Sequence, residues 1–232
     1  MKQPFSLDGL FDFSDLSPNT QHHLRRVYSY LSSGIVIAIL CFILAQFFPN
    51  LSGVFILLGT LAFVADILLI CINTNSNWER RVNFMSLYGY ASSVGGTLGS
   101  TIAGMDNESR INNYRYCMSG LVSALIIFIM FSVFSTLTSN RTQIYGLATI
   151  SSLVLSLFSW FFLGPSAILG VILGILYVIT DTQNIIYRTK SSACDAVRDA
   201  KLLFVDLVKI FYHIYEYLQK KDKDKKKKNK DK

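Results

Sequence analysis

Residues 167–186 read AILGVILGILYVITDTQNII, a largely apolar run whose single charged residue, Asp181, lies in the polar stretch Thr180-Asp181-Thr182-Gln183. About 20 residues of helix are needed to cross the hydrocarbon core of a bilayer, so this stretch has the length of a spanning helix. A carboxylate is costly to bury in hydrocarbon, and one found there marks a functional site by default. The stretch therefore predicts a membrane helix and makes Asp181 a candidate functional residue.

The composition of the whole chain also indicates a membrane protein. Of its 232 residues 51% are hydrophobic and only 16% are charged, whereas about 25% are charged in ordinary soluble domains. The net charge of +7 arises from the Lys-rich end at 220–232, and the rest of the chain is nearly neutral. We therefore expect no nucleic-acid partner. The four cysteines lack metal-ligand spacing, which predicts neither a disulfide framework nor a metal cofactor.

Apolar runs of spanning length recur along the chain and predict an all-α membrane protein with a seven-helix transmembrane bundle. Polar, Pro or Gly residues separate the first six runs, at about 29–48, 51–72, 84–104, 117–137, 143–163 and 166–187. The seventh segment, 202–218, is partly polar. Four of its residues lie on one helical stripe: Asp206, Lys209, His213 and Glu216. Asp199 and Asp195 extend this stripe toward the N-terminus. Such a helix either lies on the membrane surface or turns its stripe toward a partner or water.

Charge in the loops predicts how the chain is oriented. Lys and Arg concentrate in the loops on the side of the N-terminus, which indicates that this side is cytosolic. We expect a cytosolic N-terminal segment at 1–26, a membrane domain at 27–218 and a disordered Lys-rich tail at 219–232. Seven full spans would place the tail on the far side, so charge leaves open whether the seventh segment crosses. Lys228 and Lys230 have the spacing of a cytosolic di-lysine signal for retrieval to the endoplasmic reticulum.

Small residues at intervals of four predict where helices pack closely. The third segment contains Gly95-xxx-Gly99 and Ser100-xxx-Gly104, and the sixth contains Gly170-xxx-Gly174. Small residues at this spacing let two membrane helices approach each other closely. We interpret these pairs as packing surfaces.

Two aspartates are predicted to meet. Asp181 ends the sixth run and Asp206 begins the seventh after a short connection, so antiparallel neighbours would bring both to the same depth. Adjacent buried carboxylates cannot both ionise freely and share a proton. The pair would join the two helices when protonated and repel when deprotonated. Arg80, Arg81 and Lys209 are candidate basic partners, and Asp66, a further acid in an apolar run, has no assigned role.

Several motifs resemble those of the Bax inhibitor-1 family of small multi-spanning membrane proteins. Residues 20–28, TQHHLRRVY, are similar to the family's entry to its first helix. Asp181-Thr182-Gln183-x-Ile185-Ile186 is similar to its D-T-Q-x-I-I element. The segment 203–207, LFVDL, resembles the L-F-x-D-F of its last helix. The order and spacing of these motifs extend over most of the chain.

The resemblance implies six helices around a central seventh, residence in the endoplasmic reticulum membrane, a pH-sensitive calcium leak, suppression of apoptosis and contact with Bcl-type apoptosis regulators. It implies that Asp181 and Asp206 form the gating pair and that Arg81, or Arg80, interacts with it. Asp195 and Asp199 are further gate partners. At the second of these positions the family often has His, and Thr180 replaces its usual aromatic residue, which puts the pH midpoint of the gate in doubt.

Three functions are compatible with these features. The first is the calcium leak, in which Asp181 and Asp206 bind calcium transiently. Its ion path would be lined by further polar residues: Thr180, Thr182, Lys209, His213 and Glu216. The second is a non-conducting membrane scaffold that binds apoptosis regulators. The third, an intramembrane aspartic protease, is disfavoured because its Gly-x-Gly-Asp and Pro-Ala-Leu motifs are missing from the sequence, and we expect no enzyme. Calcium is the expected permeant ion, and membrane lipid is the expected surroundings.

Overall fold

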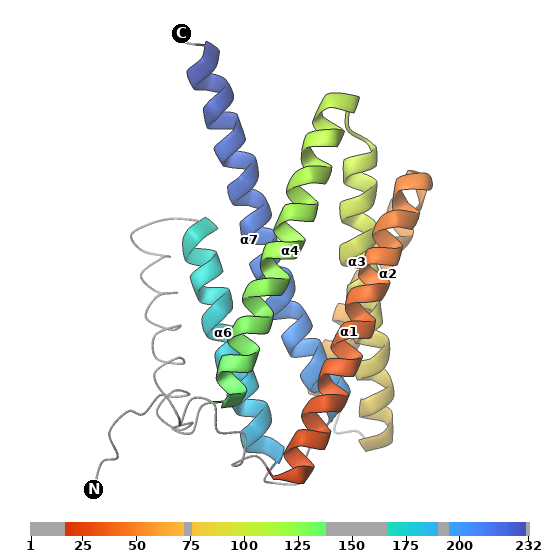
Figure 1. Cartoon of the computed structure of the whole chain (residues 1–232). Coiled ribbons are helices and arrows are strands. Elements are labelled where there is room, and N and C mark those ends of the chain that lie inside the picture. The colour runs from red at the N-terminus through yellow and green to blue at the C-terminus, as the bar shows by residue number, and fades with distance from the viewer. Residues whose placement is uncertain (1–16, 72–75, 138–166, 190–194, 231–232) are drawn as a thin grey trace, which may run out of the picture. The chain divides into compact units, whose positions relative to one another are not determined.

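The computed structural model describes residues 17–71, 76–137, 167–189 and 195–230, and nearly all of them are helical. The α-helices are α1 (Pro18–Phe47), α2 (Ser52–Cys71), α3 (Ser76–Ala103), α4 (Asn107–Leu137), α6 (Ala167–Thr189) and α7 (Ala196–Lys230), and a short 3-10 helix, η3 (Pro49–Leu51), precedes α2. They are drawn in Figure 1. No strand occurs in these ranges, so the predicted all-α class is confirmed for them. The expected fifth span, 143–163, lies outside the described residues.

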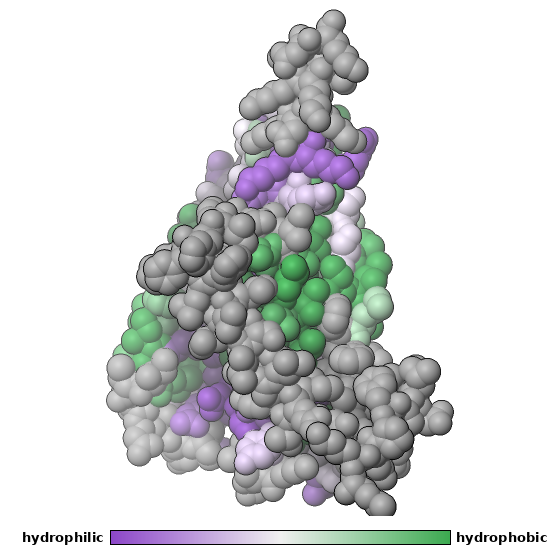
Figure 2. All heavy atoms as spheres, turned by 90° about the vertical axis from the view of Figure 1, so that its left-hand side faces the viewer, coloured by the Kyte–Doolittle hydropathy of each residue, from purple (hydrophilic) through white to green (hydrophobic). Residues whose placement is uncertain are grey.

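Four of these helices are long and apolar enough to cross a membrane: Pro18–Phe47, Pro49–Leu69, Asn107–Met130 and Leu169–Thr189. Large hydrophobic side chains on them point outward, and Leu40, Leu57 and Ile129 are each more than half exposed. Outward apolar side chains are typical of helices surrounded by lipid. Figure 2 shows hydrophobic side chains gathered on one face between hydrophilic ones. The structure thus agrees with a multi-pass membrane protein.

The helices extend beyond the apolar runs that predicted them. The break expected at 105–115 is mostly helical because α4 already begins at Asn107, and α3 begins at Ser76. The backbone N–H of Ser109 donates a 3.1 Å hydrogen bond to Asp106 Oδ2, and this backbone hydrogen bond lowers the pKa of the Asp106 carboxyl. Asp106 therefore caps α4. Hydropathy detects only the part of a helix inside hydrocarbon, whereas capping and propensity decide where the helix begins.

The Lys-rich end also differs from its prediction. Helix α7 continues to Lys230, whereas the sequence predicts disorder from residue 219. Lys is a good helix former, and Lys220 Nζ lies 2.7 Å from Glu216 Oε1 one turn earlier. Such a pair between residues i and i+4 stabilises a helix modestly. The first turns of the tail are therefore a continuation of α7.

The chain divides into two compact units. The first unit comprises residues 1–22, 116–194 and 205–232, and the second comprises 23–115 and 195–204. Most of α4, α6 and the greater part of α7 belong to the first unit. The second unit contains η3, α2, α3, most of α1 and the first turns of α7. Each unit has its own polar cluster.

In the second unit, α3 packs closely against α1 and α2 through its small residues. A Cβ on Gly95 would overlap the carbonyl oxygen of Ala38 in α1, and a Cβ on Gly96 would overlap the Phe55 ring in α2. At Gly99 it would lie 2.9 Å from the Ala45 Cβ. The predicted packing role of Gly95-xxx-Gly99 is confirmed, since no side chain fits at either position.

Candidate functional site

Helices α6 and α7 of the first unit run antiparallel in close contact. A Cβ on Gly170 would overlap the His213 ring, and one on Gly174 would overlap the Ile210 side chain. His213 lies opposite Gly170, and Ile210, which comes earlier in α7, lies opposite Gly174, which comes later in α6. The two helices therefore run in opposite directions. The Gly170-xxx-Gly174 pair provides the close approach that its spacing predicts.

Asp206 lies on α7, one turn before Ile210. Its side chain is 3% exposed, and its Oδ1 accepts a 3.3 Å hydrogen bond from Lys209 Nζ. The charged groups that act on it are Asp181 of α6 and Lys209. Lys209 Nζ also lies 4.7 Å from the centre of the Tyr177 ring of α6. The structure thus places Lys209 beside both Asp206 and Tyr177.

Several buried polar atoms in this part of the first unit have no hydrogen-bond partner among the described residues. They are Oδ2 of Asp206, the hydroxyl oxygens of Thr180 and Thr182, and Nδ1 of His213. Buried polar atoms are nearly always hydrogen-bonded to protein or to ordered water, and each exception needs an explanation. These four atoms therefore have hydrogen-bonding capacity that the described residues do not use.

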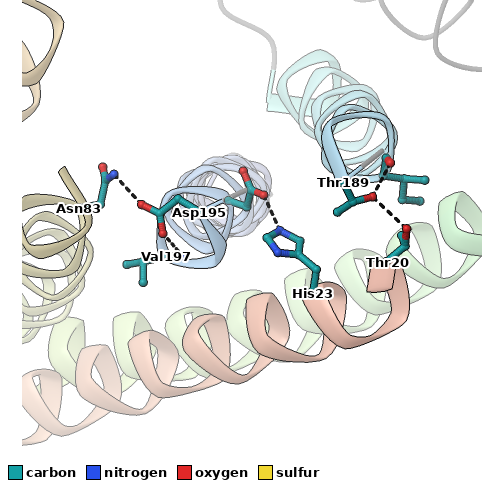
Figure 3. A network of polar contacts seen from close by, with 8 residues as sticks. Thr20, His23, Asn83, Thr189, Asp195 and Val197 are labelled. Atoms are coloured by element: carbon teal, nitrogen blue, oxygen red, sulfur yellow. Dashed lines mark hydrogen bonds and ion pairs between the residues drawn. The ribbon is translucent and has the colours of Figure 1, made fainter. Parts of the chain in front are cut away.

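The predicted gate partners Asp195 and Asp199 lie in the second unit, where each has a partner of its own. Oδ1 of Asp195 accepts a 3.0 Å hydrogen bond from the backbone N–H of Val197 and so caps α7. Oδ2 of Asp195 accepts a 3.0 Å bond from the Asn83 amide. Asp199 Oδ2 lies 2.8 Å from His23 Nε2. Figure 3 shows the His23 side chain pointing from α1 toward α7.

The remaining predicted site residues lie at exposed or partly exposed positions. Arg80 and Arg81 are exposed on the first turns of α3 in the second unit. Glu216 is partly exposed on α7, where it pairs with Lys220. Their roles as gate partners and in an ion path stay predictions. No group of three or more His, Cys, Asp and Glu side chains able to hold a metal ion occurs in the described part of the chain.

A cluster around Asp66 was not predicted. Asp66 Oδ1 lies 2.6 Å from Lys201 Nζ of α7 and accepts a 2.8 Å hydrogen bond from Ser86 of α3. Lys201 also donates a 3.0 Å bond to Asn83 Oδ1. Lys201 lies within the second turn of α7. The signal available in the sequence was the spacing of Asn83 and Ser86, three residues apart on one face of α3.

Another unpredicted contact lies in the first unit, where the start of α1 meets the end of α6. The Oγ1 atoms of Thr20 and Thr189 are 3.0 Å apart, and Thr189 also donates a 2.6 Å bond to the carbonyl of Ile186. Figure 3 includes this pair. Thr20, which opens the TQHHLRRVY motif, is buried and thus has a structural role.

Comparison with known proteins extends this description. The chain is 26% identical to Bax inhibitor 1 of Arabidopsis thaliana, over 90% of this chain and 85% of the relative. It is 27% identical to a Bax inhibitor 1 homolog of Dictyostelium discoideum with the same coverage. It is 25% identical to a probable Bax inhibitor 1 of Paralichthys olivaceus, over 94% of each chain. No solved structure gives a significant match.

A family model described as inhibitor of apoptosis-promoting Bax1 matches residues 20–223. This range includes every described helix except the first residues of α1 and the end of α7. The match, the apolar helices and the order of the sequence motifs agree with one another. The chain therefore belongs to the Bax inhibitor-1 family of multi-pass membrane proteins.

Proposed function

We propose that this chain is a pH-sensitive calcium leak channel of the endoplasmic reticulum membrane, with the N-terminus in the cytosol. By lowering the stored calcium it suppresses apoptosis, a role that the names of its relatives support. Asp181 and Asp206 form its gate by sharing a proton. The observation that carries this proposal is the buried Asp206 carboxyl, whose Oδ2 has no partner among the described residues while the charge of Asp181 acts on it.

A shared proton explains why this carboxyl is stable in the interior. Two charged carboxylates in contact repel each other, whereas one proton between them turns repulsion into a hydrogen bond. The protonated pair holds α6 against α7. Loss of the proton leaves two negative charges at the interface, and the helices separate. Lys209, at 3.3 Å from Asp206 Oδ1, favours the charged form and sets the pH at which this happens.

The permeant ion follows from the same group of atoms. Calcium prefers several oxygen ligands, and the hydroxyls of Thr180 and Thr182 are buried without partners among the described residues. Together with two deprotonated carboxylates they would form a weak, transient site. Weak binding suits a leak, because an ion must also leave. Thr182 is fully buried, so it becomes accessible only when the interface opens.

The test is calcium efflux from liposomes that contain the purified protein, measured from pH 5 to 8. For the unmodified protein we expect efflux to rise with pH as the pair loses its proton. In Asp206→Asn the amide hydrogen-bonds to Asp181 at every pH, so efflux at pH 8 should be about tenfold lower, equivalent to about 1.4 kcal/mol. Asp106→Asn is the control, because it changes an exposed loop carboxylate. Efflux that depends neither on pH nor on the substitution Asp206→Asn would contradict the proposed gate.

A scaffold that binds Bcl-type apoptosis regulators without conducting is the second candidate. The observation that favours it is the naming of the relatives, which refers to Bax inhibition and mentions no ion. It predicts no efflux from any liposome preparation in which folding is verified. It also predicts that the protein protects cells equally well with Asp206→Asn.

A further inference from the structure

The polar cluster of the second unit joins three helices around a partly buried ion pair. Its members are Asp66 of α2, Asn83 and Ser86 of α3, and Lys201 of α7; we call it the α7 lock. Lys201 is 11% exposed and Asp66 is 22% exposed, with Nζ and Oδ1 2.6 Å apart. Both charges are thus largely removed from water, and each depends on the other for compensation.

The oxygens around the ion pair complete the cluster. Asp66 Oδ1 also accepts a 2.8 Å hydrogen bond from Ser86, and the Tyr90 hydroxyl interacts with the same carboxylate. Lys201 has a second acceptor in Asn83 Oδ1 at 3.0 Å. Since α2 is apolar enough to cross a membrane, its single carboxylate needs these ion-pair and hydrogen-bond partners to be stable there.

Asn83 connects the ion pair to the start of α7. Its amide oxygen accepts from Lys201, while its amide nitrogen donates to Asp195 Oδ2 at 3.0 Å. Each end of the amide therefore has the partner that its chemistry requires, and a flipped amide would lose both. Asp195 in turn caps α7 through the Val197 N–H. The first turns of α7, residues 196–204, are thus held at two points on α3 (Figure 3 shows the Asn83–Asp195 contact).

A buried ion pair adds little net stability compared with apolar packing, yet removing one partner is strongly unfavourable. Such a contact is therefore better suited to select one of two positions of a helix than to stabilise packing in general. Both side chains retain some exposure, and Lys has a long flexible stem. The pair can thus open by moving both charges into water.

We propose that the α7 lock controls whether the first turns of α7, residues 196–204, stay packed in the second unit or are released from it. The locked state has the ion pair formed, and the released state has both charges solvated. This role is independent of calcium conduction and of the Asp181–Asp206 pair.

The test measures how readily the buried face of these turns becomes accessible in the full-length protein. Ala200 is fully buried, so Ala200→Cys is introduced after the native cysteines are replaced by alanine. Labelling by a maleimide in lipid nanodiscs then reports local opening. We expect Asp66→Asn and Lys201→Gln to be labelled at least about tenfold faster than the reference, because each leaves a buried charge without compensation.

Two further variants separate the ion pair from general damage. The charge exchange Asp66→Lys with Lys201→Asp restores opposite charges, and we expect labelling within about threefold of the reference. Lys220→Gln removes an exposed Lys from the same helix outside the second unit and should leave the rate unchanged. Single variants that label as slowly as the reference would overturn the proposal, and so would an exchange variant that labels as fast as they do.

A milder variant decides the question if the single charge variants do not fold. Ser86→Ala removes one hydrogen bond from Asp66 and keeps both charges. The released state, in which Asp66 is solvated, then becomes relatively more favourable. We expect labelling of Ala200→Cys to accelerate about threefold to tenfold, the effect of one typical hydrogen bond. An unchanged rate in the folded Ser86→Ala protein would contradict the lock.

Discussion

At the scale of single residues, three carboxylates of this protein each lie beside at least one titratable side chain. Asp206 has Asp181 and Lys209 near it, Asp66 has Lys201, and Asp199 has His23, whose Nε2 is 2.8 Å away. The three carboxylates differ in the charge of the groups beside them. A basic partner stabilises the charged carboxylate, whereas a second carboxylate favours a shared proton. Only the Asp206 environment combines both influences, which is why we assign the gate to it.

Lys209 gives the first prediction at this scale. Its positive charge favours the deprotonated form of Asp206, so Lys209→Gln should retain the proton to higher pH. We expect the pH midpoint of calcium efflux to rise by about half a unit to one unit. Lys209 is 47% exposed, so solvent screens its effect and keeps the shift at the low end of the usual range.

The matched control is Lys220→Gln, which removes a similarly exposed Lys of the same helix that pairs with Glu216. Efflux from liposomes at closely spaced pH values gives both midpoints. An unchanged midpoint for Lys209→Gln, or an equal shift for Lys220→Gln, would show that Lys209 does not act specifically on the gate.

At the scale of elements, glycine decides which helices of the second unit approach each other closely. The mean hydropathy of α3 alone does not make it a candidate span, yet its glycines lie against Ala38 of α1 and Phe55 of α2. Small residues replace the hydrophobic effect as the source of association in a membrane, because they let backbones approach and increase van der Waals contact. The position of α3, and of Asn83 and Ser86 on it, therefore depends on these contacts.

Gly95→Ala should destabilise this packing. The added methyl group would overlap the Ala38 carbonyl oxygen, which is backbone and cannot move aside without shifting the helix. We expect a loss of about 1–3 kcal/mol in the free energy of unfolding, the usual range for overpacking. Thermal unfolding of the purified protein in detergent provides the measurement.

Gly53→Ala is the control for this substitution. Gly53 lies in α2, and a Cβ there meets no atom within 4 Å. Alanine has the higher helix propensity, so this variant should be unchanged or stabilised by up to about 1 kcal/mol. Equal melting temperatures for the two variants would mean that α1 and α3 are not packed as described.

At the scale of the whole molecule, the helices form two compact units that share α7, with its first turns in the second unit and the remainder in the first. Lys201 of the α7 lock and Asp206 thus occur on one helix but belong to different units. We infer that they act on different parts of α7, and the two experiments above use separate readouts for that reason.

Orientation is a prediction for the whole molecule. A cysteine at the exposed Asn107, at the start of α4, should react with an impermeant thiol reagent only from the lumenal side of sealed vesicles. A cysteine at the exposed Glu79, near the start of α3, should react only from the cytosolic side. The physical reason is the excess of Lys and Arg in loops on the side of the N-terminus. Labelling of both positions from one side would refute the proposed orientation.

The sequence by itself determined the features that depend on local composition. Apolar runs predicted the helices, because only hydrogen-bonded helices or closed barrels satisfy the backbone in lipid. Only the tertiary structure decided the partners of Asp66 and Asp199. Lys201 and His23 lie far from them in the chain, and which charges pair depends on which helix faces come together. Hydropathy likewise could not predict that α7 continues to Lys230, since helix formation outside lipid depends on propensity and ion pairs.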